Sequence, residues 1–211
     1  TSYESCPAIA TENINLSNVI NAGSNFPKSE GFTIPADLLP GNYYVYVYTN
    51  PTKSVFEYPG TPQTKRSDLP ISIQRPDVTV SSISVPATST GSQPISISYQ
   101  LLNNGPGGVF NHLRHDRVYI SNSAVFDGSA QLIDSIVFTE NLQVGTAVPH
   151  TFVYNLPPGT SGTKYFYVFT NYDSLFRETN YSNNISAAAA TSVTAATPAD
   201  LVVSSVQPDD S

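Results

Sequence analysis

The chain has 211 residues, of which 39% are hydrophobic and only 12% are charged, and its formal net charge is -7. The low charge excludes a solvated disordered chain and a coiled coil, and nine Lys and Arg residues spread over the chain make nucleic acid a poor partner. No run of about 18 apolar residues is present, so no membrane span is expected. The single Cys excludes a disulfide framework within the chain and a zinc site built from cysteines.

The residue types favour strands over helices. Tyr, Phe, Val, Ile and Thr are frequent and suit pleated, half-buried surfaces, whereas 17 Pro and 12 Gly interrupt the chain at short intervals. An all-β fold with polar, uncharged surfaces is therefore predicted. This chemistry is common in secreted and cell-surface proteins, so we expect an extracellular or cell-surface location.

Residues 1–27 are irregular and rich in Asn, Ser and Pro, and the first clear strand pattern comes at 41–50. Tyr44, Tyr46 and Tyr48 alternate along this segment. Such alternation is better explained by core packing than by a sugar-binding platform of aromatic rings. Further along, Tyr167 is expected in a core, whereas Tyr58 and Tyr172, near strand ends, are expected at the surface.

An internal repeat is the most informative feature of the sequence. Residues 41–50 match residues 162–171 at a constant offset of 121, and at this offset Glu57 falls on Glu178. A second match, at an offset of 123, relates the segment from Asp77 to the segment from Asp200. The repeat predicts an incomplete first sandwich unit, a complete unit, and a third unit that has only begun; their ranges are 1–75, 76–197 and 198–211.

Seven short strands are expected in the complete unit, at the spacing of an immunoglobulin-like or fibronectin-like sandwich. The segment 165–170 is apolar on both faces and should be central in its sheet. A turn is expected at 103–108, where Asn, Gly and Pro cluster. The strands are predicted at 78–85, 95–101, around Val118 and Ile120, at 132–138, around Phe152 and Tyr154, at 165–170 and at 185–193.

This unit resembles the CARDB module, a cell-adhesion-related domain of bacterial and archaeal surface proteins. The resemblance covers roughly 77–197 and implies an extracellular sandwich, often in tandem, without catalysis. It is carried by Pro76-Asp77-Val78, the turn from Asn103 to Gly107, the segment from Asp116 to Ser121, and Glu178 followed by Asn180, Asn183 and Asn184.

The incomplete first unit leaves three interpretations open. The chain could be a window cut from a longer tandem array, strands could come from a neighbouring subunit, or the first domain could be degenerate and self-sufficient. The second interpretation gives a role to an assembly strand at the far end of the chain. Its residues are Asp200, Leu201, Val202, Val203 and Val206.

The resemblance also implies a calcium site between residues 116 and 134. Family members often carry spaced aspartates there, and Asp116, Asn122, Asp127 and Asp134 are the candidate ligands in this chain. Ser stands at two positions where further acids would be expected, and fewer carboxylates weaken calcium affinity. The alternative is a turn built on Asp127 and Gly128. No other cofactor is expected.

The remaining candidates are weaker. The cluster from His112 to Arg117 is interpreted as a loop in which Arg117 pairs with Asp116 or Glu178, rather than as a metal or catalytic site. No Gly-x-Ser-x-Gly elbow is present, and we expect no enzyme activity. Cys6 is expected to be an inert thiol. Sequons for N-glycosylation occur at Asn15, Asn180 and Asn184.

Taken together, these features predict a structural, non-catalytic segment of an extracellular filament, stalk or large adhesin. Its partners would be copies of itself or adjacent tandem domains. Strand complementation is a candidate way of joining them head to tail. Surface glycans are a further candidate partner. The alternative is an accessory carbohydrate- or matrix-binding module of a secreted hydrolase. A binder of that kind needs two or three coplanar exposed rings, whereas a stalk buries most of its aromatics.

Overall fold

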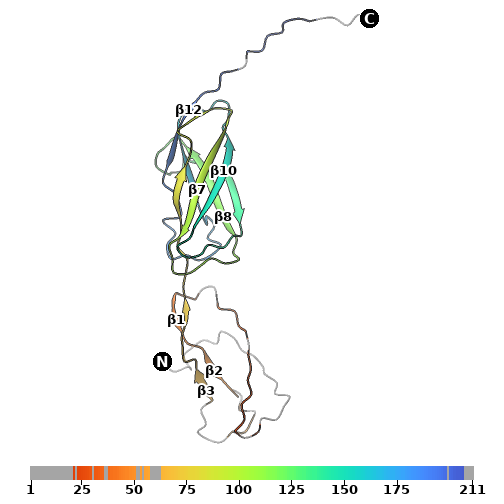
Figure 1. The fold of residues 1–211 in the computed structure, drawn as a ribbon, viewed down its shortest axis with the longest axis vertical. Coiled ribbons are helices and arrows are strands. Elements are labelled where there is room, and N and C mark those ends of the chain that lie inside the picture. The colour runs from red at the N-terminus through yellow and green to blue at the C-terminus, as the bar shows by residue number, and fades with distance from the viewer. Residues whose placement is uncertain are drawn as a thin grey trace, which may run out of the picture. The chain divides into compact units, whose positions relative to one another are not determined.

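A computed structural model describes residues 21, 23–29, 31–35, 38–50, 53, 55–57, 63–198 and 200–206. The described residues form twelve strands and no helix, so none of them lies in a helix long and apolar enough to cross a membrane. The chain divides into two units, Thr1–Gln74 and Arg75–Ser211 (Figure 1).

The second unit is a sandwich of two sheets whose strands are mostly antiparallel (Figure 1). One sheet has the order β10-β7-β5, and the other has the order β6-β12-β11-β8-β9. The predicted all-β sandwich is confirmed for this unit. The bounds are β5 Val78–Ser84, β6 Thr88–Thr90, β7 Pro94–Asn103, β8 Arg114–Ser121, β9 Gln131–Phe138, β10 Ala147–Asn155, β11 Gly162–Phe169 and β12 Ala189–Thr194.

Alternating side chains from both sheets build the core between them. Along β7, Ile95, Ile97, Tyr99 and Leu101 point inward and are at most 2% exposed, while their neighbours face away. In the other sheet β11 pairs with β12 on one edge and with β8 on the other, so its predicted central position is confirmed. Burial of this apolar surface is the main stabilising contribution to such a fold.

Two strands differ from the expectation. The short strand β6 was not predicted, because three Ser and Thr residues give too short a pattern to detect. The last strand, expected from Ile185, begins at Ala189, and Ile185 forms only an isolated bridge with Phe169.

The first unit consists, in its described part, of four short strands. Strand β1 (Gly41–Tyr43) pairs with β4 (Ile71–Ile73), and β2 (Tyr46–Tyr48) pairs with β3 (Thr64–Arg66). All four belong to one long antiparallel hairpin, in which 41–48 is one arm and 64–73 is the other.

This hairpin corresponds to β11 and β12, with a register that differs by one residue at the start. Gly41 pairs with Ile73, whereas Gly162 pairs with Val193, one residue before the position equivalent to Ile73. Farther along, Tyr48 pairs with Thr64 at positions equivalent to the bridge between Phe169 and Ile185. In the second unit the opposite edge of β11 is occupied by β8; among the described residues of the first unit, that edge of 41–48 has no strand partner.

The tyrosines of the first unit are not in a core, and the expectation for them is wrong. Tyr44, Tyr46 and Tyr48 are 42%, 38% and 40% exposed, whereas Tyr167, which matches Tyr46 in the repeat, is 2% exposed. Tyr167 lies on the face of β11 opposite to the core residues Phe166 and Val168, where Phe126 and the carbonyl of Ser123 cover it. Among the described residues of the first unit, no aromatic ring packs on Tyr46 in the same way. Alternation in the sequence marks a strand but does not show that anything covers it.

Candidate functional site

Strand β8 carries a buried ionic network at its beginning. Arg114 is 1% exposed, and its Nε and Nη2 donate to Asp116 Oδ1 and Oδ2 at 2.9 and 3.2 Å. The same Nη2 donates to Glu140 Oε1 at 2.8 Å. The hydroxyls of Thr170 and Tyr99 also donate to Asp116, at 2.7 and 3.3 Å. Both oxygens of this buried carboxylate are therefore committed to internal hydrogen bonds.

The network is unsuited to proton exchange. Burial lowers the pKa of Arg114, but its pairing with Asp116 and Glu140 outweighs this and raises the pKa overall. Burial also raises the pKa of Tyr99, helped by the charge of Asp116. Arg114 thus stays charged and Tyr99 stays neutral across ordinary pH.

Arg117 does not make the expected ion pair. It lies over the ring of Tyr172, with 3.5 Å between Cζ and the ring centroid. Successive strand residues point to opposite faces, so Arg117 faces away from Asp116, and Arg114 takes the carboxylate instead. The expectation of a loop at 112–117 is likewise wrong for 114–117, which belong to β8.

The two histidines of this cluster have separate neighbours. His112 packs against Phe176 at 6.1 Å between ring centroids, and His115 Nδ1 lies 2.5 Å from Asp173 Oδ2. Within the part of the chain that the structure describes, no three His, Cys, Asp or Glu residues gather as a group that could hold a metal ion.

The four candidate calcium ligands are not assembled into one site. Asp116 lies in the buried network, and Asn122 follows six residues later along an extended strand, about 20 Å away. Asp134 is exposed on β9. Asp127 accepts hydrogen bonds from the amide and hydroxyl of Ser129, the geometry of the turn that was the alternative interpretation.

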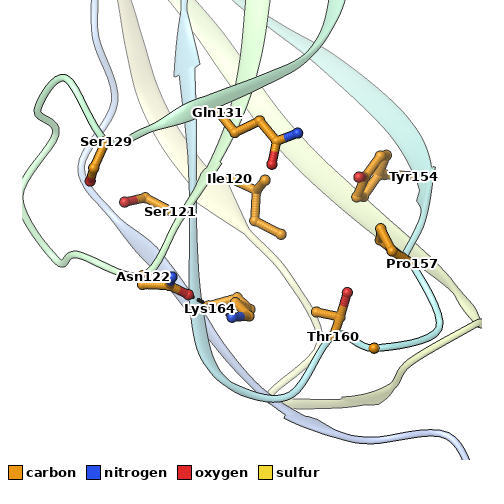
Figure 2. Close-up of a pocket in the computed structure, with 10 residues that line it drawn as sticks. Ile120, Ser121, Asn122, Ser129, Gln131, Tyr154, Pro157, Thr160 and Lys164 are labelled. Atoms are coloured by element: carbon orange, nitrogen blue, oxygen red, sulfur yellow. Dashed lines mark hydrogen bonds between the residues drawn. The ribbon is translucent and has the colours of Figure 1, made fainter.

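A cavity of about 320 Å³ opens near Asn122, at the ends of β8 and β10 and the starts of β9 and β11 (Figure 2). Asn122 and Ser129 line it, but Lys164 is its one charged lining residue, and Lys164 Nζ donates to Asn122 Oδ1 at 2.5 Å. Calcium requires six to eight oxygen ligands with carboxylates among them. The residues at this cavity therefore do not fit a calcium ion.

A second buried carboxylate ties the beginning of the unit to its last loop. Glu178 is 3% exposed, and its Oε2 accepts from the backbone N of Val78 at 2.5 Å. Its Oε1 accepts from Asn171 Nδ2 at 2.6 Å and from Asn184 Nδ2 at 2.8 Å. The opening strand β5 is thereby fastened to the segment between β11 and β12. Sequence reasoning noted the Glu and the Asn-rich turn but not this role.

Glu178 gives the fold a pH dependence. Burial raises the pKa of this carboxyl above its ordinary 4.5, although the hydrogen bonds from Asn171, Val78 and Asn184 act in the opposite direction. The folded chain thus holds the proton to higher pH than the unfolded chain. The contribution of Glu178 to the free energy of unfolding is then fully present below pH 4.5 and decreases as pH rises through the folded pKa.

The comparison of wild type with Glu178→Gln checks this sign. Urea titrations at a series of pH values give the free energy of unfolding of each protein. The value for the wild type, relative to that for Glu178→Gln, should decrease as pH rises out of the acid range. A difference that shifts towards the wild type with rising pH would contradict the account.

The sequons lie in different surroundings. Asn184 is 1% exposed, and its Nδ2, the atom a glycan would occupy, donates to Glu178 and to the carbonyl of Thr170. Asn180 is exposed and closes a turn with Ser182. Asn180 is therefore accessible and Asn184 is not. The predictions for Asn15, Cys6 and Tyr58 fall outside the described residues.

The predicted surface aromatic Tyr172 does not form a flat platform. Tyr172 is 39% exposed, as predicted. Its ring meets that of Phe169 at 83°, and Arg117 covers its face. A sugar ring stacks on coplanar exposed rings, and this arrangement provides none at Tyr172.

The predicted assembly strand is exposed. Leu201, Val202, Val203 and Val206 are 92%, 78%, 79% and 82% exposed, and Asp200 is exposed as well. Among the described residues, none pairs with this segment as a strand. An exposed segment of apolar, strand-forming residues presents a row of unpaired backbone N–H and C=O groups that can join another sheet.

Residues 75–188 match the family described as CARDB. Solved structures with a similar fold include the CARDB domain of a Pyrococcus furiosus protein in complex with di-metal ions, at 22% identity and a TM-score of 0.45, covering 57% of this chain and 90% of that one. A solution structure of the same domain has 20% identity and a TM-score of 0.42, covering 57% of this chain and 97% of that one.

A β-glucosidase from Listeria innocua in complex with glucose is similar at 13% identity, with a TM-score of 0.37, over 68% of this chain and 20% of that one. A comparison with curated protein sequences gives no match. All three TM-scores lie below 0.5, and the assignment rests on the family match alone.

The second unit is thus an all-β sandwich that belongs to a class of bacterial modules related to cell adhesion. The chain belongs to the CARDB family.

Proposed function

We propose that this chain is a structural, non-catalytic part of an extracellular or cell-surface assembly, and that copies join head to tail by strand addition. The observation that carries the proposal is the segment 200–206, which repeats the sequence of the opening strand β5 and lies exposed without a strand partner among the described residues.

The chemistry of the buried acids supports a structural role. Among the described residues of the second unit, Asp116 and Glu178 are the buried carboxylates, and their oxygens accept hydrogen bonds from within the chain. A catalytic carboxylate must instead face a site where a substrate can reach it. The arrangement around Tyr172 gives no support to the carbohydrate-binding alternative.

The apolar surface of the first unit supports assembly. No second sheet covers its hairpin among the described residues. Val47 on β2 and Phe56 between the two arms of the hairpin are 58% and 93% exposed. An exposed apolar surface of this kind is typical of a surface that receives another segment of chain.

Substitution of Val203 by Asp tests the proposal. Wild-type chains are expected to associate with increasing concentration in sedimentation velocity, and Val203→Asp chains are expected to remain monomeric. A charge in the middle of the segment would have to be buried without a partner when the strand docks.

Val125→Asp is the matched control, because Val125 is 71% exposed on a loop outside the segment. This variant should associate like the wild type. Wild-type chains that stay monomeric throughout, or Val203→Asp chains that associate equally well, would refute assembly through 200–206.

A further inference from the structure

The buried site around Glu178 has a counterpart in the first unit. At the offset of 121, Asn171, Glu178 and Asn184 fall on Asn50, Glu57 and Gln63. We call these last three residues the Glu57 cradle. Two of its members are identical to their counterparts, and the third changes one amide side chain for a longer one.

The backbone of the two sites also matches. Asn50 and Asn171 have positive φ angles of 50° and 44°, and Lys53 and Ser174, which follow them, have φ angles of 52° and 54°. The N–H of Lys53 donates to the carbonyl of Asn50 at 3.0 Å, as that of Ser174 donates to Asn171 at 2.9 Å. Left-handed backbone at two equivalent non-glycine positions shows that the same tight turn is built twice.

The side-chain hydrogen bonds are repeated as well. Asn50 Nδ2 donates to the carbonyl of Val55 at 2.7 Å, as Asn171 Nδ2 donates to the carbonyl of Phe176 at 3.1 Å. Gln63 Nε2 donates to Glu57, as Asn184 Nδ2 donates to Glu178. The carboxylate of Glu57 is therefore held by an amide from the same position in the fold.

The two sites differ in the contact with an opening strand. Glu178 Oε2 accepts the backbone N–H of Val78, the second residue of the Asp77-Val78 opening. Glu57 is exposed, and the hydrogen bond that its carboxylate accepts among the described residues comes from the side chain of Gln63. The first unit thus has the receiving carboxylate for an opening strand but, in its described part, lacks the strand.

One segment of the chain carries the matching strand. At the offset of 123, Asp200 and Leu201 fall on Asp77 and Val78, and Val203 and Val206 fall on Val80 and Ile83. In the second unit Val80 and Ile83 pack against the core. Leu201, Val203 and Val206 are at least 79% exposed and have no such core to cover.

We infer that the strand Asp200–Val206 of a second copy docks on the first unit, and that its Leu201 N–H donates to Glu57. This inference rests on the proposed function and names its docking site. A charge-assisted hydrogen bond of this kind fixes the register of the incoming strand. The apolar side chains of the strand would cover part of the exposed face of the hairpin.

The topology of the second unit favours a second copy as the donor. Val78, at the beginning of the unit, lies beside Asn103, whereas Thr194, at its end, lies beside Thr90. Strand β7 runs between these two ends over ten residues, or about 33 Å. The segment therefore leaves the unit at the end opposite to Arg75, in the arrangement of a head-to-tail chain.

Two variants test the docking by complementation. Glu57→Ala removes the acceptor but leaves the strand intact, and Leu201→Pro removes the donating N–H but leaves the acceptor intact. Each variant alone is expected to self-associate at least ~10-fold more weakly than the wild type, as loss of a hydrogen bond to a charged group implies. An equimolar mixture should form a one-to-one dimer in sedimentation velocity, because each chain retains the half that the other lacks.

Two controls accompany the variants. Asp68→Ala removes one carboxylate from the same unit at a side chain that is 91% exposed, and Leu201→Val keeps the N–H. Both should associate like the wild type. Leu201→Pro lies in an exposed segment, so it keeps the test valid even if Glu57→Ala disturbs the fold of the first unit.

The outcomes separate the inference from the proposed function. If wild-type and Glu57→Ala chains associate equally well, docking at Glu57 is overturned, but assembly through 200–206 stands. A mixture that stays monomeric, although the wild type associates, would also overturn the docking. Wild-type chains that remain monomeric at every concentration would overturn both.

Discussion

Replacement of Asp116 by Ala is expected to lower the free energy of unfolding of the second unit by about 3–5 kcal/mol. The guanidinium of Arg114, which is 1% exposed, would lose a bidentate partner and keep only Glu140. The hydroxyls of Thr170 and Tyr99 would lose their acceptor at the same time. Urea unfolding followed by circular dichroism measures the loss.

Asp134→Ala is the control for this prediction, because Asp134 is exposed on the edge strand β9. Its effect should stay within about 0.5 kcal/mol of zero, as is usual for surface sites. A double substitution, Arg114→Met with Asp116→Leu, should recover much of the stability, since no buried charge is left unpaired. An Asp116→Ala chain as stable as the wild type would show that the network does not hold β8.

Replacement of Tyr167 by Ala is expected to cost about 3–5 kcal/mol, whereas the same change at Tyr46 should cost about 1 kcal/mol or less. The two tyrosines are equivalent in the repeat, but Tyr167 is 2% exposed and Tyr46 is 38% exposed. Tyr167 packs against Phe126, and its hydroxyl donates to the carbonyl of Ser123 at 2.8 Å. Among the described residues, no aromatic ring packs on Tyr46 as Phe126 packs on Tyr167.

The measurement uses dilute, monomeric protein, so that a docked strand does not cover Tyr46. Unfolding of each unit is followed separately by hydrogen exchange of its backbone amides under increasing denaturant. Equal losses at Tyr46 and Tyr167 would contradict the account, because they would place both rings in comparable cores.

The strands of the second unit could be predicted because most alternate cleanly. Strand β7 reads Ile95, Ile97, Tyr99 and Leu101 on one face, and β11 is apolar on both, which indicated its central place. Strand β8 was harder to delimit because Arg114 and Asp116 occupy inward positions where apolar residues are expected. Their charges neutralise each other only after folding, so a hydrophobicity pattern cannot detect them.

The candidate site was less predictable for a similar reason. Glu178 was noted for its place in the repeat, but its bond to Val78 N joins residues 100 positions apart and depends on the complete fold. The match of Glu57 with Glu178 was the available signal. The exposure of Tyr46 could not be foreseen, since a strand pattern does not tell whether another segment covers that face of the strand, as the segment with Phe126 covers Tyr167.

Hydrogen exchange at the amides of residues 201–206 tests the central claim most directly, because it reports whether this segment becomes a paired strand. The account predicts slow exchange at high protein concentration and fast exchange on dilution, with Val203→Asp chains fast under both conditions. Fast exchange at every concentration, in wild-type chains that nevertheless associate, would contradict strand addition as the means by which copies join.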